Sequence, residues 1–93
     1  MTSNDSSHEI GRRIKEIRLS RGLTQQAFAA SLGIVQGFLS DVERGKKLPS
    51  DTLLIALCHL YEINEEWLFS GTGEISRTLM NQEEAERSVA SRT

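Results

Sequence analysis

The sequence predicts an all-α fold of five helices in a single domain, and three observations support this. Apolar residues recur at spacings of three and four, as on the buried face of a helix. Glycines and polar capping residues separate these stretches at short intervals. No segment alternates polar and apolar residues between turns, as a half-buried strand would. The 93 residues suffice for one small core, so we expect no second domain.

The first helix is expected over residues 8–21. Three isoleucines form its apolar stripe, at Ile10, Ile14 and Ile17. Gly22 supplies a stop signal, and the opposite side of the helix is basic. Residues 1–7 are rich in Ser, Asn and Asp and are expected to be disordered, with Ser6 or Ser7 capping the helix that follows.

The next two helices are short and close together in the sequence. Thr24 caps a second helix over residues 25–32, which ends at Gly33. A third helix is expected over residues 36–44, and Gly45 closes it. The inward-facing pair of this third helix is Leu39 and Val42. A basic loop, Gly-Lys-Lys-Leu-Pro, follows.

Two further helices complete a domain that is expected to span residues 8–73. Ser50 caps the fourth helix, over residues 51–61, and Asn64 caps a short fifth helix. The apolar face of the fourth helix is expected at Leu53, Ala56, Leu57 and Leu60. Residues 74–93 form a polar tail, which is either a frayed helix, a linker, or an arm that orders on a partner or in a dimer interface.

Charge is distributed unevenly along the chain, although the net charge is only −2. Residues 10–49 contain eight basic and three acidic side chains, whereas residues 50–93 contain three basic and eight acidic ones. The first half can therefore face a DNA duplex, and the acidic half should face away from it. The basic cluster on the first helix, at Arg12, Arg13 and Lys15, is interpreted as a solvated helix face.

Several function classes are disfavoured by the composition. A single cysteine, Cys58, cannot form an internal disulfide and suits a reducing cytoplasm. We expect a cytoplasmic protein without membrane contact, because no segment approaches the roughly 18 apolar residues of a membrane span. His8 and His59 lack partners at metal-binding spacing, and no nucleophile stands beside a base. A metal, a cofactor and enzymatic activity are therefore not expected.

The second and third helices carry the informative pattern. Two short helices that cross steeply need a small residue where their backbones approach, and Ala29 provides it. The turn between them needs a residue that tolerates positive φ, which Gly33 provides. Burial of the inward pair leaves a polar strip on the outer side, at Gln36, Gly37, Ser40 and Asp41. This strip has the size and polarity needed to read base edges in the major groove.

Three segments together closely resemble the lambda-repressor-like family of prokaryotic and phage regulators. They are GRRIKEIRLSRGLTQQAFAASLGI, VQGFLSDVERGKKLPS and NEEWLFSGTGE, and the resemblance covers about residues 9–73. It implies a compact five-helix DNA-binding domain whose helix-turn-helix is formed by the second and third helices.

The resemblance implies a role for each matching position. Gln25 would hydrogen-bond a DNA phosphate and brace the recognition helix. Phosphate contacts are implied for Thr24, Gln25, Arg44, Lys46 and Lys47. Base reading is implied for Gln36, Gly37, Phe38, Ser40 and Asp41. The third helix would thus read bases while its surroundings hold the DNA backbone.

Some positions depart from the family pattern. Val35 stands where relatives commonly have a Ser or Thr cap, which costs the helix start about 1 kcal/mol. Gly37 has no side chain for base contacts, so DNA shape is expected to contribute to specificity. Asp41 places a negative charge near the phosphates, where it either selects a cytosine amino group or holds back non-specific binding.

Two further expectations concern contacts between elements. The resemblance implies that Arg18 and Glu43 form a buried, bidentate ion pair that fixes the angle of the recognition helix; the alternative is that both lie on the surface. Trp67 is expected either in the core or, with Leu68 and Phe69, in a dimer seam.

These features together predict a sequence-specific transcriptional regulator that binds double-stranded DNA. The leading hypothesis is a homodimeric repressor on a palindromic operator, with half-sites about one helical turn apart. Two alternatives stay open. One is an antitoxin that neutralises a toxin and binds DNA to regulate itself, and the other is a protein-interaction module that shows no salt-dependent DNA binding.

Overall fold

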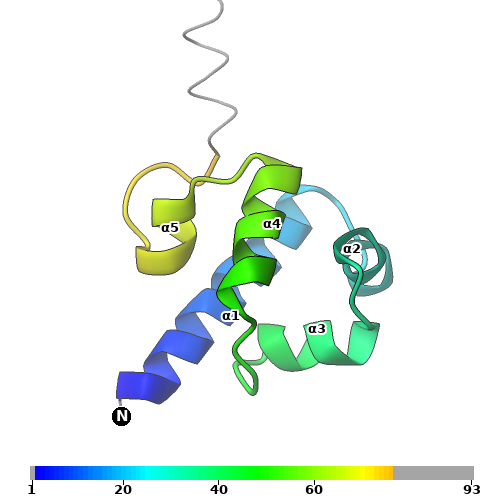
Figure 1. The fold of residues 1–93 in the computed structure, drawn as a ribbon, viewed down its shortest axis with the longest axis horizontal. Helices are drawn as coiled ribbons and strands as arrows, with labels where there is room; N and C mark the ends of the chain where they lie inside the picture. The colour runs from blue at the N-terminus through cyan, green and yellow to red at the C-terminus, as the bar shows by residue number, and fades with distance from the viewer. Residues whose placement is uncertain (1, 77–93) are drawn as a thin grey trace, which may run out of the picture. The chain divides into compact units, whose positions relative to one another are not determined.

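The computed structural model describes residues 2–76, with side chains from residue 7 onward. Five helices lie in this range (Figure 1): α1 (Thr2–Ser20), α2 (Gln25–Leu32), α3 (Gln36–Glu43), α4 (Asp51–Tyr61) and α5 (Glu65–Ser70). The predicted all-α class is confirmed, and the described residues pair extended backbone only in an isolated antiparallel bridge between Ile63 and Ser76. They form two compact units, 2–56 and 57–76, divided within α4.

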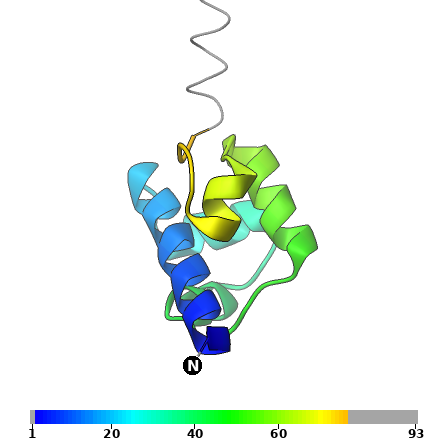
Figure 2. The same ribbon diagram turned by 90° about the vertical axis from the view of Figure 1, so that its left-hand side faces the viewer.

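Helix α1 begins at Thr2, earlier than the expected start at residue 8, and it runs through Ser6 and Ser7, so the expected cap at these residues is wrong. Once a helix is nucleated, each added residue gains a backbone hydrogen bond, and no proline or glycine stops α1 from extending backward. Figure 2 shows α1 lengthwise, with the N-terminus at the bottom. Its predicted stripe is confirmed, because the three isoleucines are at most 8% exposed. The helix ends before Gly22, whose φ is 69°.

The predicted helix-turn-helix is confirmed as α2, a glycine turn and α3. The Thr24 hydroxyl oxygen accepts a hydrogen bond from the Ala27 N–H at 3.1 Å and caps α2. Gly33 ends α2 with φ 73°, in the left-handed region that glycine tolerates best. Val35 supplies no side-chain cap to α3, as its residue type predicts. In Figure 1, α2 is seen end-on while α3 lies across the view, so the two helices cross steeply.

Both helices bury one face. The buried side chains are Phe28 and Ala29 from α2 and Leu39 and Val42 from α3, none more than 2% exposed. Helices of eight residues are too short to be stable alone, so this burial, rather than intrinsic propensity, holds them in place.

Helices α1 and α3 approach very closely at Gly11. A Cβ atom built on Gly11 would lie 2.1 Å from the backbone oxygen of Val42, closer than any side-chain atom can approach. Gly11 is therefore required by the contact between α1 and α3, and not by its backbone conformation. The sequence pattern gave no signal for this, because the constraint comes from a residue on another helix.

Helix α4 has the predicted bounds and the predicted cap, since the Leu53 N–H donates to the Ser50 hydroxyl at 3.2 Å. Its predicted face is wrong in part. The buried residues are Leu54, Leu57 and Cys58, whereas Ala56 is exposed and Leu60 is 54% exposed. A helix this rich in leucine offers more than one stripe at helical spacing, and only packing decides which one is buried.

The second unit closes on itself around α5. The Asn64 side chain accepts from the Glu66 N–H at 3.1 Å and caps α5, as predicted. The Asn64 N–H donates to the Ile75 carbonyl at 3.0 Å, which joins the chain after α5 to the chain before it. Cys58 is fully buried, as expected for a small hydrophobe. The predicted tail beyond residue 76 lies outside the described residues.

Candidate nucleic-acid interface

The predicted base-reading residues lie on one exposed side of α3. Gln36 and Gly37 are exposed, and a Cβ atom at Gly37 would meet nothing within 4 Å. Phe38, Ser40 and Asp41 are half-buried. The strip, which is Gln36, Gly37, Phe38, Ser40 and Asp41, therefore lies opposite the buried pair Leu39 and Val42 and presents short polar groups around one aromatic ring.

A buried ion pair anchors α3 to α1. The Arg18 Nε atom donates to Glu43 Oε2 at 2.8 Å, and its terminal nitrogen donates to Oε1 at 3.2 Å. The side chains are 11% and 2% exposed. Another Arg18 nitrogen donates to the Leu23 carbonyl at 2.9 Å, at the entry to α2. The predicted bidentate pair is thus present, and the surface alternative is wrong.

Gln25 extends this network from Glu43 to the first exposed residue of α3. The Gln25 side-chain amide donates to Glu43 Oε1 at 3.0 Å, and the Gln36 amide donates to Gln25 Oε1 at 3.4 Å. Three helices are therefore linked through consecutive side chains from Arg18 to Gln36. The family resemblance implied that Gln25 braces α3, but it did not identify Glu43 as a partner of Gln25.

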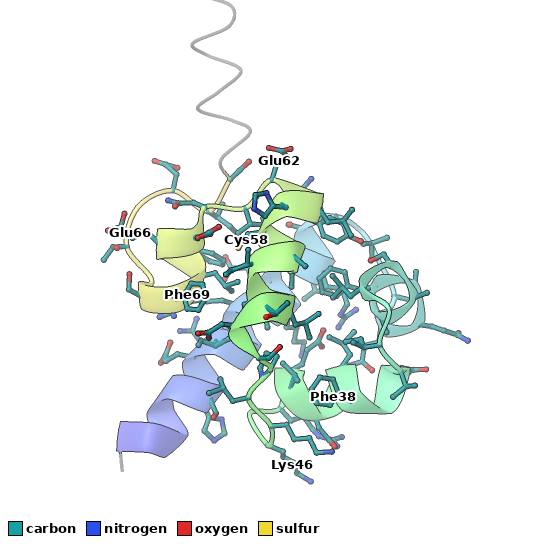
Figure 3. All side chains as sticks on the ribbon, viewed as in Figure 1. Phe38, Lys46, Cys58, Glu62, Glu66 and Phe69 are labelled. Atoms are coloured by element: carbon teal, nitrogen blue, oxygen red, sulfur yellow. The ribbon has the colours of Figure 1, made fainter. Side chains whose placement is uncertain are left out.

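The basic residues beside the strip differ in their partners. At the end of α3, Arg44 donates to Asp41 Oδ1 at 2.8 Å. The Lys47 ammonium lies 3.4 Å from Asp41 Oδ2 and 5.7 Å from the centroid of the Phe38 ring. The Lys46 side chain is exposed and has no partner among the described residues. Figure 3 shows Phe38 and Lys46 at the same end of the first unit.

Asp41 is held ionised by these cations. The hydrogen bond from Arg44 lowers the pKa of the Asp41 carboxyl, partial burial opposes this, and Lys47 lowers it further. One carboxylate in the predicted base-reading strip therefore pairs with two of the three cations predicted to contact phosphate.

Thr24 and Gln25 lie at the N-terminus of α2, on the side of the helix-turn-helix where Gln36 begins α3. The positive end of a helix dipole favours an anion there. The Thr24 hydroxyl already accepts the capping hydrogen bond but keeps its own proton for donation.

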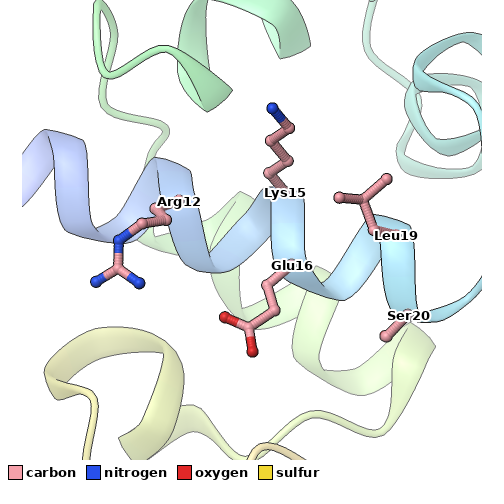
Figure 4. Close-up of a pocket in the computed structure, with 5 residues that line it drawn as sticks. All are labelled: Arg12, Lys15, Glu16, Leu19 and Ser20. Carbon is pink, nitrogen blue, oxygen red and sulfur yellow. The ribbon is translucent and has the colours of Figure 1, made fainter.

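The basic cluster predicted on the first helix lies on α1, away from the strip on α3. Arg12 and Arg13 both pair with Glu9 within α1. The Arg12 side chain is 64% exposed, as expected for a solvated helix face, whereas the Arg13 side chain is only 14% exposed, so the expectation is wrong for Arg13. Figure 4 shows the outer side of this helix, where Leu19 is 58% exposed near Lys15 and Glu16. Within residues 2–76, no group of three metal-ligating side chains is close enough to hold an ion, and no helix is both long and apolar enough to cross a bilayer.

The predicted dimer seam is wrong at one position. Leu68 is fully buried within the chain, so it is not available to a partner. Trp67 is half-buried and Phe69 is 39% exposed. Along a helix, successive residues point about 100° apart, so a tripeptide on α5 cannot present all three side chains to one surface.

This arrangement of helices is that of a known protein family. A family model described as helix-turn-helix matches residues 14–68, more than half of the chain. The chain belongs to the helix-turn-helix family. The match runs from the middle of α1 to α5 and so includes the Arg18 and Glu43 pair and the whole of α3. The resemblance to lambda-repressor-like regulators is thereby confirmed.

Similar proteins carry regulator names. The chain is 46% identical over 44 residues to the uncharacterized HTH-type transcriptional regulator YazB of Bacillus subtilis, covering 47% of this chain and 64% of YazB. It is 35% identical over 68 residues to the HTH-type transcriptional regulator ImmR of the same organism, covering 73% of this chain and 53% of ImmR. The chain therefore spans between about half and two thirds of the length of these relatives.

Solved structures show the same fold. The restriction-modification controller protein C.AhdI from Aeromonas hydrophila superposes with a TM-score of 0.66 at 26% identity, over 74% of this chain and all of that one. The clp gene regulator ClgR from C. glutamicum superposes with a TM-score of 0.61 at 27% identity, over 67% of this chain and 80% of ClgR.

Proposed function

We propose that this protein is a transcriptional regulator that binds double-stranded DNA sequence-specifically and acts as a dimeric repressor. The observation that supports this best is the exposed polar strip on α3, which the network from Arg18 to Gln36 holds rigidly against α1 and α2. A helix presented at a fixed angle, with cations at its end, suits insertion into the major groove.

The residue roles follow from this placement. Gln36 is the first exposed residue of α3, and its amide is suited to bidentate contact with adenine. Its present partner, Gln25, can hold the amide in position for that contact. Thr24, Gln25 and the basic residues after α3 would contact phosphates, which sets orientation and contributes salt-dependent affinity.

Dimerisation is proposed because a single eight-residue helix reads only a few base pairs. Two coupled half-sites multiply the discrimination, since binding at the second site becomes intramolecular. A two-fold dimer would therefore recognise a palindromic operator with half-sites about one helical turn apart. The names of the similar proteins, all regulators or controllers, agree with regulation of transcription.

The test starts from duplexes selected by the wild-type chain out of a randomised pool. Gln36→Ala should weaken binding to the selected duplex by about 1–3 kcal/mol and leave binding to a mixed-sequence duplex nearly unchanged. Lys46→Ala should weaken both alike and reduce the slope of log affinity against log salt by about one. Fluorescence anisotropy across a salt series measures both quantities.

The proposal fails if the wild-type chain enriches no sequence from the pool. The assignment of Gln36 fails if Gln36→Ala affects the selected and the mixed-sequence duplexes equally.

A further inference from the structure

Asp41 occupies an unusual position for a carboxylate, because it lies in the middle of a surface proposed to meet polyanionic DNA. It is not a free charge there. Arg44 at 2.8 Å and Lys47 at 3.4 Å each contact a different oxygen of its carboxylate. Both cations are more than half exposed, at 58% and 55%, so solvent and ligands can reach them.

Lys47 is held on two sides at once. Besides its contact with Asp41, its ammonium lies over the Phe38 ring, 5.7 Å from the centroid. Two residues of the recognition strip thus hold a loop cation that would otherwise extend toward a phosphate. Lys46, the neighbouring residue, has no such partner within residues 7–76 and therefore serves as the reference.

Resting on the proposed function, we propose that Asp41 determines specificity by competing with DNA phosphates for Arg44 and Lys47. On mismatched DNA these cations stay with Asp41, because releasing them would leave its negative charge uncompensated beside the phosphates. Two phosphate contacts are then weakened, and non-specific affinity is low.

A matching DNA site favours the release of Arg44 and Lys47 from Asp41. In the major groove only cytosine and adenine present an amino group, and an amino hydrogen donated to Asp41 can replace a hydrogen bond from a cation. Arg44 and Lys47 then become available to the DNA backbone. The matching base thus increases the affinity for DNA in two ways, through its own contact with Asp41 and through the release of two phosphate-binding side chains.

The experiment compares Asp41→Asn with Glu16→Gln as a matched control. Both substitutions remove one negative charge, but Glu16 is exposed on α1 and holds neither Arg44 nor Lys47. Asp41→Asn should raise affinity for a mixed-sequence duplex about tenfold and steepen the salt slope by up to about two. Glu16→Gln should change affinity less than about twofold by long-range charge alone.

On the duplex selected by the wild-type chain, Asp41→Asn should change affinity much less, so the ratio of selected to mixed-sequence binding should fall about tenfold. Equal effects of Asp41→Asn and Glu16→Gln, or an equal gain on both duplexes, would overturn the proposal. The wild-type chain distinguishes failure of this inference from failure of the proposed function. If the proposed function is wrong, the wild-type chain should bind the selected and mixed-sequence duplexes equally; if only this inference is wrong, it should still prefer the selected duplex.

A second pair of variants keeps the test independent of the stability of Asp41→Asn. Lys47→Gln should weaken binding to the selected duplex while leaving the salt slope on the mixed-sequence duplex unchanged, because Lys47 is already held by Asp41. Lys46→Gln should lower the slope by about one on both duplexes. Identical behaviour of the two lysine variants would contradict the proposal.

Discussion

At the scale of single residues, Glu43 is a charged group that is buried in the fold. Its carboxylate accepts two hydrogen bonds from Arg18 and one from Gln25, and its side chain is 2% exposed. Burial of a charge is costly unless it is paired and hydrogen-bonded, and Glu43 meets both conditions. The pair therefore specifies how α1 and α3 are joined more than it adds net stability.

Removal of one partner should be far more harmful than removal of both. We expect Arg18→Met or Glu43→Leu alone to destabilise the fold by roughly 3–5 kcal/mol, because each leaves a buried charge unpaired. The double variant should recover part of this loss. Urea denaturation of the four proteins in a double-mutant cycle measures the coupling energy. A coupling energy near zero would mean that the pair is not formed in solution.

At the scale of elements, the contact between α1 and α3 depends on a glycine, because any side chain at that position would meet backbone atoms. Gly11 lies inside α1, where alanine would normally be preferred by about 1 kcal/mol. Its replacement would place a methyl group on the Val42 carbonyl, and backbone cannot move aside as a flexible side chain can. Packing therefore opposes helix propensity at this position.

Gly11→Ala and Gly37→Ala give a matched comparison of these two effects. Gly37→Ala, in open space on α3, should stabilise by up to about 1 kcal/mol. Gly11→Ala should destabilise by about 1–3 kcal/mol or more, since α1 and α3 must separate. Thermal or urea unfolding of both variants checks the signs. Equal stabilisation by the two substitutions would show that the helices are not in close contact at Gly11.

At the scale of the whole molecule, charge and apolar surface suit different tasks. The basic excess lies in residues 10–49 and the acidic excess in residues 50–93. The proposed DNA contacts all belong to the first group, while the exposed Phe69 ring belongs to the second. An acidic segment is a poor DNA ligand, so its apolar residues are better suited to contact a second copy of the chain.

We expect a homodimer whose affinity depends on Phe69. Phe69→Ser should weaken dimerisation by about 2 kcal/mol or more, roughly 30-fold, because aromatic residues contribute strongly to interfaces. Leu19→Ser, at an exposed apolar residue on α1, is the control and should leave the equilibrium unchanged. Analytical ultracentrifugation measures both. A wild-type monomer at micromolar concentration, with and without DNA, would contradict the expectation.

The sequence by itself determined the all-α class, the turn between α2 and α3, and the starts of the last four helices. Caps and glycines act within a few residues of their own position, so the starts of α2 through α5 and the positive φ of Gly33 could be read directly. The pair of Arg18 and Glu43 followed from a family resemblance, because their separation of 25 positions carries no local signal.

Only the tertiary structure decided which stripe of α4 is buried, that Leu68 is interior, and that Gly11 faces a backbone oxygen. It also showed that Asp41 binds Lys47 across the end of α3. Each of these depends on the position of atoms from another segment. Spacing within one helix defines directions relative to its own axis, whereas burial and pairing depend on what packs against it.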